Sequence, residues 1–274
     1  MYTKSKISSL KEKHTFLVCI FIAVGFLGLL HSTQLLIKLG ITSKGYAPLL
    51  IQEFVGVVFS VIIMFLLGKA YILREKGEGI LRGLWTGGFL VCLGLLAAVS
   101  GFAVVLNQGK ANELLPLSQI VIFAITMLEI GIAEEFIFRG IILNLLIDKF
   151  HKTQKGIYAS IAVSSIIFGI AHITNIFSGV SIKGAVVQAF GAAVLGALLA
   201  AIYIRTKNIW VVAIIHAFND FSSLIGSGLF GTNSVVSQIN SYSYAKLIVC
   251  LVYLVPVFIL LRKKKLLEIV ENQE

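Results

Sequence analysis

The chain has 274 residues, of which 58% are hydrophobic and 13% are charged, and its mean hydropathy is +0.96. Soluble domains carry about 25% charged residues, so this composition excludes an ordinary soluble domain and indicates that lipid is the main solvent. The net charge of +10 would favour a nucleic-acid partner only if the basic residues clustered on one water-exposed face. Cys19, Cys92 and Cys250 lie in apolar runs without CxxC spacing, so the sequence indicates neither a disulfide framework nor a metal knuckle.

Eight apolar stretches approach the length of about 20 residues that a helix needs to cross the hydrocarbon core. The first is too long for a signal peptide, and no small-residue cleavage motif follows it, so we expect an uncleaved span. The fourth is followed by a mixed segment, 136–147, which either continues the helix or lies along the interface. The sequence therefore predicts an all-α polytopic membrane helix bundle of about eight transmembrane helices. The predicted spans are 15–36, 47–67, 84–106, 115–133, 158–177, 184–204, 209–230 and 244–261.

The Lys and Arg residues are distributed unevenly between the two sides of these spans. One set of connections holds 17 of them and the other set holds 5, while Arg139 falls at a span. Positive charge favours the cytoplasmic side, so we expect a multi-pass cell-membrane protein with both termini in the cytoplasm. Topology and an anionic inner leaflet account for the basic charge, so the bilayer is the predicted partner and no nucleic acid is needed.

Ionisable side chains inside the spans indicate where function lies, because each costs roughly 2.5–3.5 kcal/mol at the bilayer centre on insertion scales. In the first half of the chain, His31 and Glu53 are interpreted as structural, since either can reach the interface or a neighbour. The second half carries a denser set. Its members lie in or beside spans four, five and seven: Glu129, Glu134, Glu135, Arg139, His172, His216 and Asp220.

Two adjacent glutamates end the fourth span. Glu135 precedes Arg139 by four residues, the better orientation for an ion pair on one helix face. Glu134 is rotated by about 100° from Glu135, so it is left to face a cavity and act on water as a general base. The alternative interpretation is a salt bridge that only locks helices together, which leaves Glu134 unexplained.

Histidines supply the other two polar clusters. His172 follows Phe168 by four residues, with the small residues Gly169 and Ala171 just before it, and alone it would suit a packing hydrogen bond. His216 precedes Asp220 by four residues, a spacing that can fix the imidazole tautomer for metal binding or for work on a carbonyl. Three polar clusters on three separate helices favour function over packing.

The series Glu-Glu-x-x-x-Arg, Phe-x-x-x-His and His-x-x-x-Asp, in this order on successive membrane segments, resembles the CPBP (Abi) family of intramembrane proteases, which includes type II CAAX prenyl endopeptidases. The resemblance covers roughly residues 115–230. It divides the chain into N-terminal transmembrane helices one to three (1–110), a CPBP-like catalytic core of helices four to seven (111–235), and the last helix with a basic cytoplasmic tail (236–274).

The resemblance implies an endopeptidase that cleaves a peptide or membrane-protein substrate near the cytoplasmic face, in bacteriocin or peptide maturation or in self-immunity. It implies that Glu134 activates water, that His172 helps to hold this water, and that His216 and Asp220 stabilise the oxyanion or orient the substrate. Glu135 and Arg139 are implied as the supporting pair. The family name suggests a metalloprotease, with His172 and His216 as zinc ligands, but the H-E-x-x-H spacing is missing and a metal-free glutamate mechanism is equally compatible.

Depth and packing give two further expectations. Span four runs inward, so Glu134 is expected toward the cytoplasmic side, with His216 roughly 12 Å from that side but His172 roughly 21 Å. Span six carries small residues every four positions, which predicts a face packed against the helices that bear the site, with Gln188 in a packing hydrogen bond.

Two other classes of function compete with hydrolysis. A small proton-coupled transporter could use the same buried acids and histidines, but it would predict inverted repeats with broken helices in both halves. A non-catalytic immunity or scaffold membrane protein would act by binding alone. The sequence leaves this second alternative open.

Overall fold

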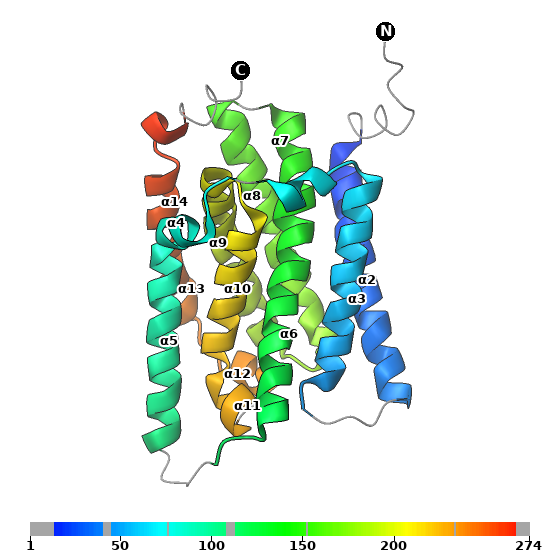
Figure 1. Ribbon diagram of the computed structural model, residues 1–274, viewed down its shortest axis with the longest axis vertical. Helices are drawn as coiled ribbons and strands as arrows, with labels where there is room; N and C mark the ends of the chain where they lie inside the picture. Colours follow the sequence, from blue (N-terminus) through cyan, green and yellow to red (C-terminus); the bar gives the residue numbers. More distant parts are fainter. Residues whose placement is uncertain are drawn as a thin grey trace.

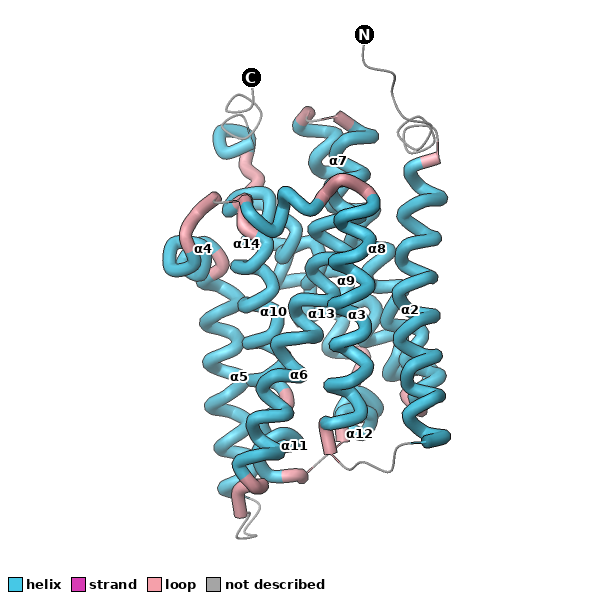
Figure 2. Tube along the Cα trace, turned by 45° about the vertical axis from the view of Figure 1, so that its right-hand side comes forward, coloured by secondary structure: helices cyan, strands magenta, loops and turns pink. Residues whose placement is uncertain are grey.

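The computed structural model describes residues 14–40, 45–75, 77–107, 113–151, 153–232 and 234–266 of the chain. Over these residues the secondary structure is helical and includes no strand (Figure 2). The long helices run side by side as one bundle (Figure 1). This confirms the predicted all-α helix bundle.

Each predicted span corresponds to a helix or to a run of consecutive helices. Five helical segments within the described residues are long and apolar enough to cross a membrane by themselves, namely α2, α3, α5, α8 with η3, and α9. The elements that correspond to the eight predicted spans are, in chain order, α2 (Thr15–Gly40), α3 (Ala47–Leu66), α5 (Gly88–Asn107), α6 (Leu117–Glu135), α8 (Gln154–Ala171), α9 (Ile182–Thr206), α10 (Ile209–Ser223) with α11 (Ile225–Phe230), and the run α13 (Ala245–Cys250), η4 (Leu251–Tyr253) and α14 (Leu254–Leu260). The remaining elements are η1 (Ala70–Arg74), α4 (Ile80–Thr86), η2 (Phe136–Leu143), α7 (Asn144–Phe150), η3 (His172–Ser178) and α12 (Val235–Asn240).

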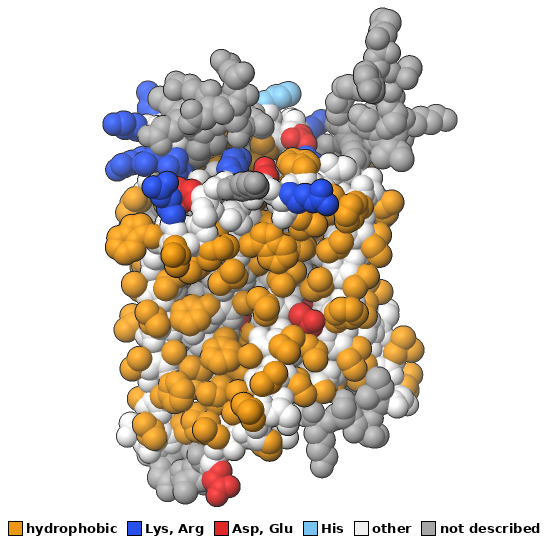
Figure 3. Space-filling model, in the orientation of Figure 1, with side chains coloured by type: hydrophobic (Ala, Val, Ile, Leu, Met, Phe, Trp, Pro, Cys, Tyr) orange, Lys and Arg blue, Asp and Glu red, His pale blue; other side chains and the backbone are white. Residues whose placement is uncertain are grey.

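The Lys and Arg side chains gather at one end of the bundle, above a broad hydrophobic belt (Figure 3). We call this the basic end; α2 begins there and α14 ends there (Figure 1). Lys183 in α9 and Lys246 in α13 lie toward the opposite end, where these helices begin. Eight lysines that were counted in the charge distribution lie outside the described residues: Lys4, Lys6, Lys11, Lys13, Lys44, Lys76, Lys110 and Lys152.

The mixed segment after the fourth span continues the helix. Element η2 is a stretch of π-helix that joins α6 to α7 without a break. Side chains satisfy some of the carbonyls in this stretch: Ser164 Oγ donates to Phe138 O at 3.0 Å, and Asn144 Nδ2 donates to Arg139 O at 2.8 Å. Wide turns of this kind inside α-helices are often found at functional sites.

This continuation corrects the expected depth of Glu134. Residues 135–150 extend the helix beyond Glu134 toward the basic end, so Glu134 lies at mid-depth instead of close to that end. His172 lies just past the far end of α8, which starts at the basic end. Glu134 and His172 therefore lie at a similar depth in the bundle. The predicted difference in depth between them disappears because the helix that carries Glu134 continues beyond its apolar stretch.

Polar caps fix where two of the site-bearing helices begin. Thr153 Oγ1 accepts a hydrogen bond from Gly156 N at 3.1 Å at the start of α8. Asn208 Oδ1 accepts one from Trp210 N at 3.0 Å at the start of α10. Such caps satisfy backbone donors that the first helical turn leaves free. Together with helix length they set the depth of His172 and His216.

Small residues let α9 approach α8 and η2 closely. A Cβ atom on Gly169 would lie 2.6 Å from Ala189 O and 2.7 Å from Ala193 Cβ, so α8 and α9 cross with backbones nearly in contact. A Cβ atom on Gly196 would lie 3.1 Å from Arg139 Nη2. The predicted packing of the small-residue face of span six against the helices that bear the site is confirmed.

Gly169→Ala is expected to lower the free energy of unfolding by about 1–3 kcal/mol, because the added methyl group must push two helix backbones apart. Gly28→Ala is the matched control, since a Cβ atom there meets nothing within 4 Å. Thermal unfolding of the detergent-solubilised protein measures both. Equal stability of the two variants would contradict the close α8–α9 crossing.

Candidate active site

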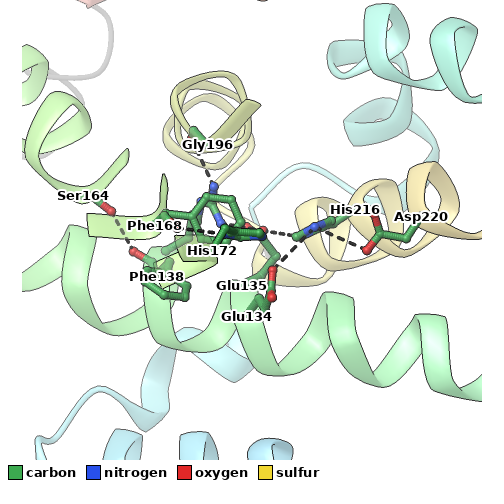
Figure 4. A network of polar contacts seen from close by, with 10 residues as sticks. Glu134, Glu135, Phe138, Ser164, Phe168, His172, Gly196, His216 and Asp220 are labelled. Atoms are coloured by element: carbon green, nitrogen blue, oxygen red, sulfur yellow. Dashed lines mark hydrogen bonds and ion pairs between the residues drawn. The ribbon is translucent and has the colours of Figure 1, made fainter. Parts of the chain in front are cut away.

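Side chains from three helical segments meet inside the bundle (Figure 4). Glu134 and Glu135 end α6, His172 follows α8, and His216 and Asp220 lie on α10. Five of the six predicted site residues are labelled in this view, and the sixth, Arg139, is bonded to Glu135. The structure therefore brings together the six predicted site residues, whereas Glu129 is not among them.

Arg139 and Glu135 form a buried ion pair. Arg139 Nη1 lies 2.6 Å from Glu135 Oε1, and the side chains are 1% and 0% exposed. Arg139 Nη2 also donates to Gly196 O at 3.2 Å, and the guanidinium lies 4.4 Å from the ring centroid of Phe168. Pairing, a backbone acceptor and an aromatic face together offset the cost of burying this cation. The predicted supporting pair thus has the geometry of a structural anchor.

His216 is oriented by the same glutamate. Its Nδ1 atom lies 2.8 Å from Glu135 Oε1. Because that carboxylate is already paired with Arg139 and can only accept, we assign the Nδ1 proton to His216. The other ring nitrogen, Nε2, then faces Glu134 Oε2 at 3.7 Å and Asp220 Oδ2 at 3.6 Å.

His172 is held in a defined tautomer by its own helix. Its Nδ1 atom lies 2.9 Å from the carbonyl oxygen of Phe168, one turn earlier. A carbonyl only accepts, so Nδ1 carries the proton and Nε2 is left for a ligand or a water molecule. The ring of Phe168 packs edge-on against His172, with 4.8 Å between the ring centroids. The Phe-x-x-x-His spacing therefore has a physical role in fixing this imidazole.

A cavity of about 480 Å³ lies beside these groups. Glu134, His172, His216 and Asp220 line it, whereas Glu135 and Arg139 do not appear among the described lining residues. Glu134 is 20% exposed, in contrast to the fully buried Glu135. The two neighbouring glutamates thus have different surroundings, one tied into the protein and one facing open space.

The cavity also contains groups that the sequence analysis interpreted as structural. Glu53 on α3 is 5% exposed and lines the cavity, as does His31 on α2. The sequence does mark both residues as unusual, because each is an ionisable side chain within an apolar span. Only the fold shows that α2 and α3 border the site.

Two amide side chains also line the cavity. Gln188 accepts the predicted packing hydrogen bond from Asn175 Nδ2 at 2.9 Å. Asn219 is another lining residue, and its Nδ2 atom donates to Ile215 O at 2.8 Å.

The donor groups do not match a preformed zinc site. In the described parts of the chain, no three His, Cys, Asp or Glu side chains are arranged to hold a metal ion. Structural and catalytic zinc sites use at least three protein ligands at about 2.0–2.3 Å. We therefore derive no reaction step through a metal at His172 and His216.

Arg139→Gln is expected to cost about 3–5 kcal/mol of unfolding free energy, because it leaves Glu135 buried without its cation. Adding Glu135→Gln should recover part of this loss. Asp148→Asn is the comparison: it breaks the Lys69–Asp148 pair, also 2.6 Å long, but Asp148 is 58% exposed and the expected cost is about 1 kcal/mol or less. Unfolding in detergent measures all three, and equal losses for the two single variants would contradict the anchoring role of Arg139.

Comparison with known protein families gives a match in the second half of the chain. Residues 116–222 match the family model described as Rce1-like, type II CAAX prenyl endopeptidase Rce1-like. No curated protein and no solved structure matches the chain. The matched segment lies within the predicted core 111–235 and contains all six predicted site residues. It confirms the resemblance that the three motifs indicated, because residues 116–222 are similar to the type II CAAX prenyl endopeptidases.

Proposed function

We propose that this chain is an intramembrane endopeptidase in which Glu134 is the general base. The match to a CAAX-type endopeptidase family supports peptide-bond hydrolysis in general. One observation carries the assignment of the base: of the two adjacent glutamates, Glu135 is buried and pairs through Oε1 with Arg139 and His216, while Glu134 faces the cavity. Only a carboxylate with access to water can take a proton from it.

In the proposed first step, a water molecule sits between Glu134 and His172. Glu134 accepts one proton of the water, and the His172 Nε2 lone pair accepts a hydrogen bond from the other. The water oxygen attacks the carbonyl carbon of the scissile peptide bond, whose π electrons move onto the carbonyl oxygen. A base positioned in this way contributes about 10²–10⁴-fold to the rate.

The developing oxyanion needs a donor, and we assign this role to His216. Its Nδ1–H group is held by Glu135, so the ring is fixed with Nε2 aimed at the cavity, near Glu134 and Asp220. In its protonated form Nε2–H donates to the oxyanion, and Asp220 orients the ring. Donors fixed in advance where charge develops are often the largest contribution to catalysis.

Collapse of the intermediate completes the reaction. The carbon–nitrogen bond breaks, and the proton held by Glu134 passes to the leaving nitrogen, so the products are a carboxylic acid and an amine. One water molecule is consumed and Glu134 returns to its starting state. The substrate is a peptide or a membrane-protein segment, and none of these steps requires a prenyl group.

The proposed setting is the cell membrane, with several spans and both termini in the cytoplasm. The uneven distribution of Lys and Arg supports this orientation. Maturation of a bacteriocin or another peptide, or self-immunity, would place such an enzyme beside its substrate.

Glu134→Gln is expected to reduce hydrolysis by about 10²–10⁴-fold, because the amide cannot accept the proton of water. Purified protein in liposomes is incubated with a fluorescence-quenched peptide library, and fragments are identified by mass spectrometry. Glu129→Gln is the matched control: it makes the same change on the same helix at a residue outside the cavity lining, and full activity is expected.

The two variants also separate the competing functions. Equal activity of Glu134→Gln and the unmodified chain would overturn the proposed base. In a strain that the chain protects against a peptide toxin, protection that persists in Glu134→Gln while cleavage stops would favour an immunity protein that acts by binding.

Removal of metal gives a second test of the mechanism. Because the described side chains do not form a three-ligand site, hydrolysis is expected to continue after dialysis against EDTA and 1,10-phenanthroline. The rate on the same quenched peptides is compared before and after dialysis. A loss of activity that added zinc restores would contradict the metal-free mechanism.

A further inference from the structure

The cavity occupies one half of the bundle. Its lining comes mainly from the halves of α2, α9 and α10 remote from the basic end, from the start of α3, and from η3, α12 and α13. The second half of α6, the end of α8 and Phe138 of η2 complete it at the level of the site. Among the described lining residues, none belongs to η1, α4, α7 or α14, the elements grouped at the basic end (Figure 1). The cavity therefore extends from the site away from the basic end.

The half of the bundle between the site and the basic end is solid. Most residues that follow Glu134 along η2, precede His216 on α10, or lie in the last turns of α9 are buried and apolar. Examples are Ile141, Ile202 and Val212, each 0–1% exposed. Close packing of this kind leaves no channel for a peptide. A substrate cannot reach Glu134 through this layer without unfolding it.

The remote part of the cavity has a polar rim, which we define as Gln34, Gln52, Asn175, Gln238 and Lys246. All five line the cavity and are half-buried. Four of them carry side-chain amides, which both donate and accept hydrogen bonds as a peptide main chain does. The fifth, Lys246, lies over the ring of Tyr242, which also lines the cavity. This chemistry suits an extended peptide segment better than a purely apolar ligand.

We infer that the substrate enters through the polar rim, from the end of the bundle opposite the basic end. With both termini in the cytoplasm, this is the non-cytoplasmic face, so the substrate class is an extended peptide segment exposed on the outer side of the membrane. The inference rests on the proposed function and replaces the expected cleavage near the cytoplasmic face. It depends on the direction of the cavity, whereas the choice of base does not.

Single cysteines at the two ends test the inference. The starting variant carries Cys19→Ala, Cys92→Ala and Cys250→Ala. Val236→Cys then places a thiol in the cavity lining on α12, and Gln154→Cys places the matched thiol on the exposed first residue of α8 at the basic end. A membrane-impermeant sulfonated maleimide is applied to intact and to permeabilised cells.

Val236→Cys is expected to react in intact cells at least tenfold faster than Gln154→Cys, which should react only after permeabilisation. Reaction of Val236→Cys only after permeabilisation would overturn the inference. So would failure of Val236→Cys to react in either preparation, because the cavity would then be closed at this end.

Blocking the cavity at Val236, two residues before Gln238 of the polar rim, tests whether this opening is needed for hydrolysis. A maleimide carrying a polyethylene glycol chain is attached to each cysteine in liposomes, and cleavage of the quenched peptides is measured. Modified Val236→Cys is expected to lose at least nine tenths of its activity, and modified Gln154→Cys to keep it. Full activity with the rim blocked would overturn the route while leaving the base at Glu134 intact; normal activity of Glu134→Gln would instead overturn the proposed function.

Discussion

The Arg139 guanidinium, buried within a membrane bundle, is the constraint on which the arrangement of the site depends. A cation in this position must be paired and hydrogen-bonded, because an isolated charge in a low-dielectric interior is very costly. Glu135, the carbonyl of Gly196 and the ring of Phe168 meet these needs. These partners come from three different helical segments, so satisfying one charge also fixes how the segments lie against one another.

The Arg139–Glu135 pair also gives the two neighbouring glutamates different surroundings. Glu135 accepts hydrogen bonds at Oε1 from Arg139 and from the Nδ1–H group of His216, and this second bond sets the tautomer of the imidazole. Glu134, one residue earlier, has neither partner within hydrogen-bonding distance and faces the cavity. Adjacent residues thus supply a buried ion pair and a carboxylate that faces the cavity, because Glu135 orients the His216 ring whose Nε2 atom faces Glu134.

Much of this could be predicted from the sequence, because the relevant signals are local. Apolar runs determine the helices, the spacing of Glu135 and Arg139 determines their pairing, and the small residues of α9 determine its close packing. The depth of Glu134 could not be predicted in this way. It depends on the continuation of α6 through η2, whose carbonyls are satisfied in part by Ser164, a residue on another helix. The role of Glu53 as cavity lining and the direction of the cavity also depend on how distant helices assemble.

The solid layer between the cavity and the basic end has a consequence for the membrane as a barrier. A carboxylate at mid-depth that water reaches from both sides would offer protons a path along the electrochemical gradient. Here buried apolar residues such as Ile141, Ile202 and Val212 separate Glu134 from the basic end. Because the cavity also opens away from the basic end, water that enters it reaches Glu134 from one end of the bundle.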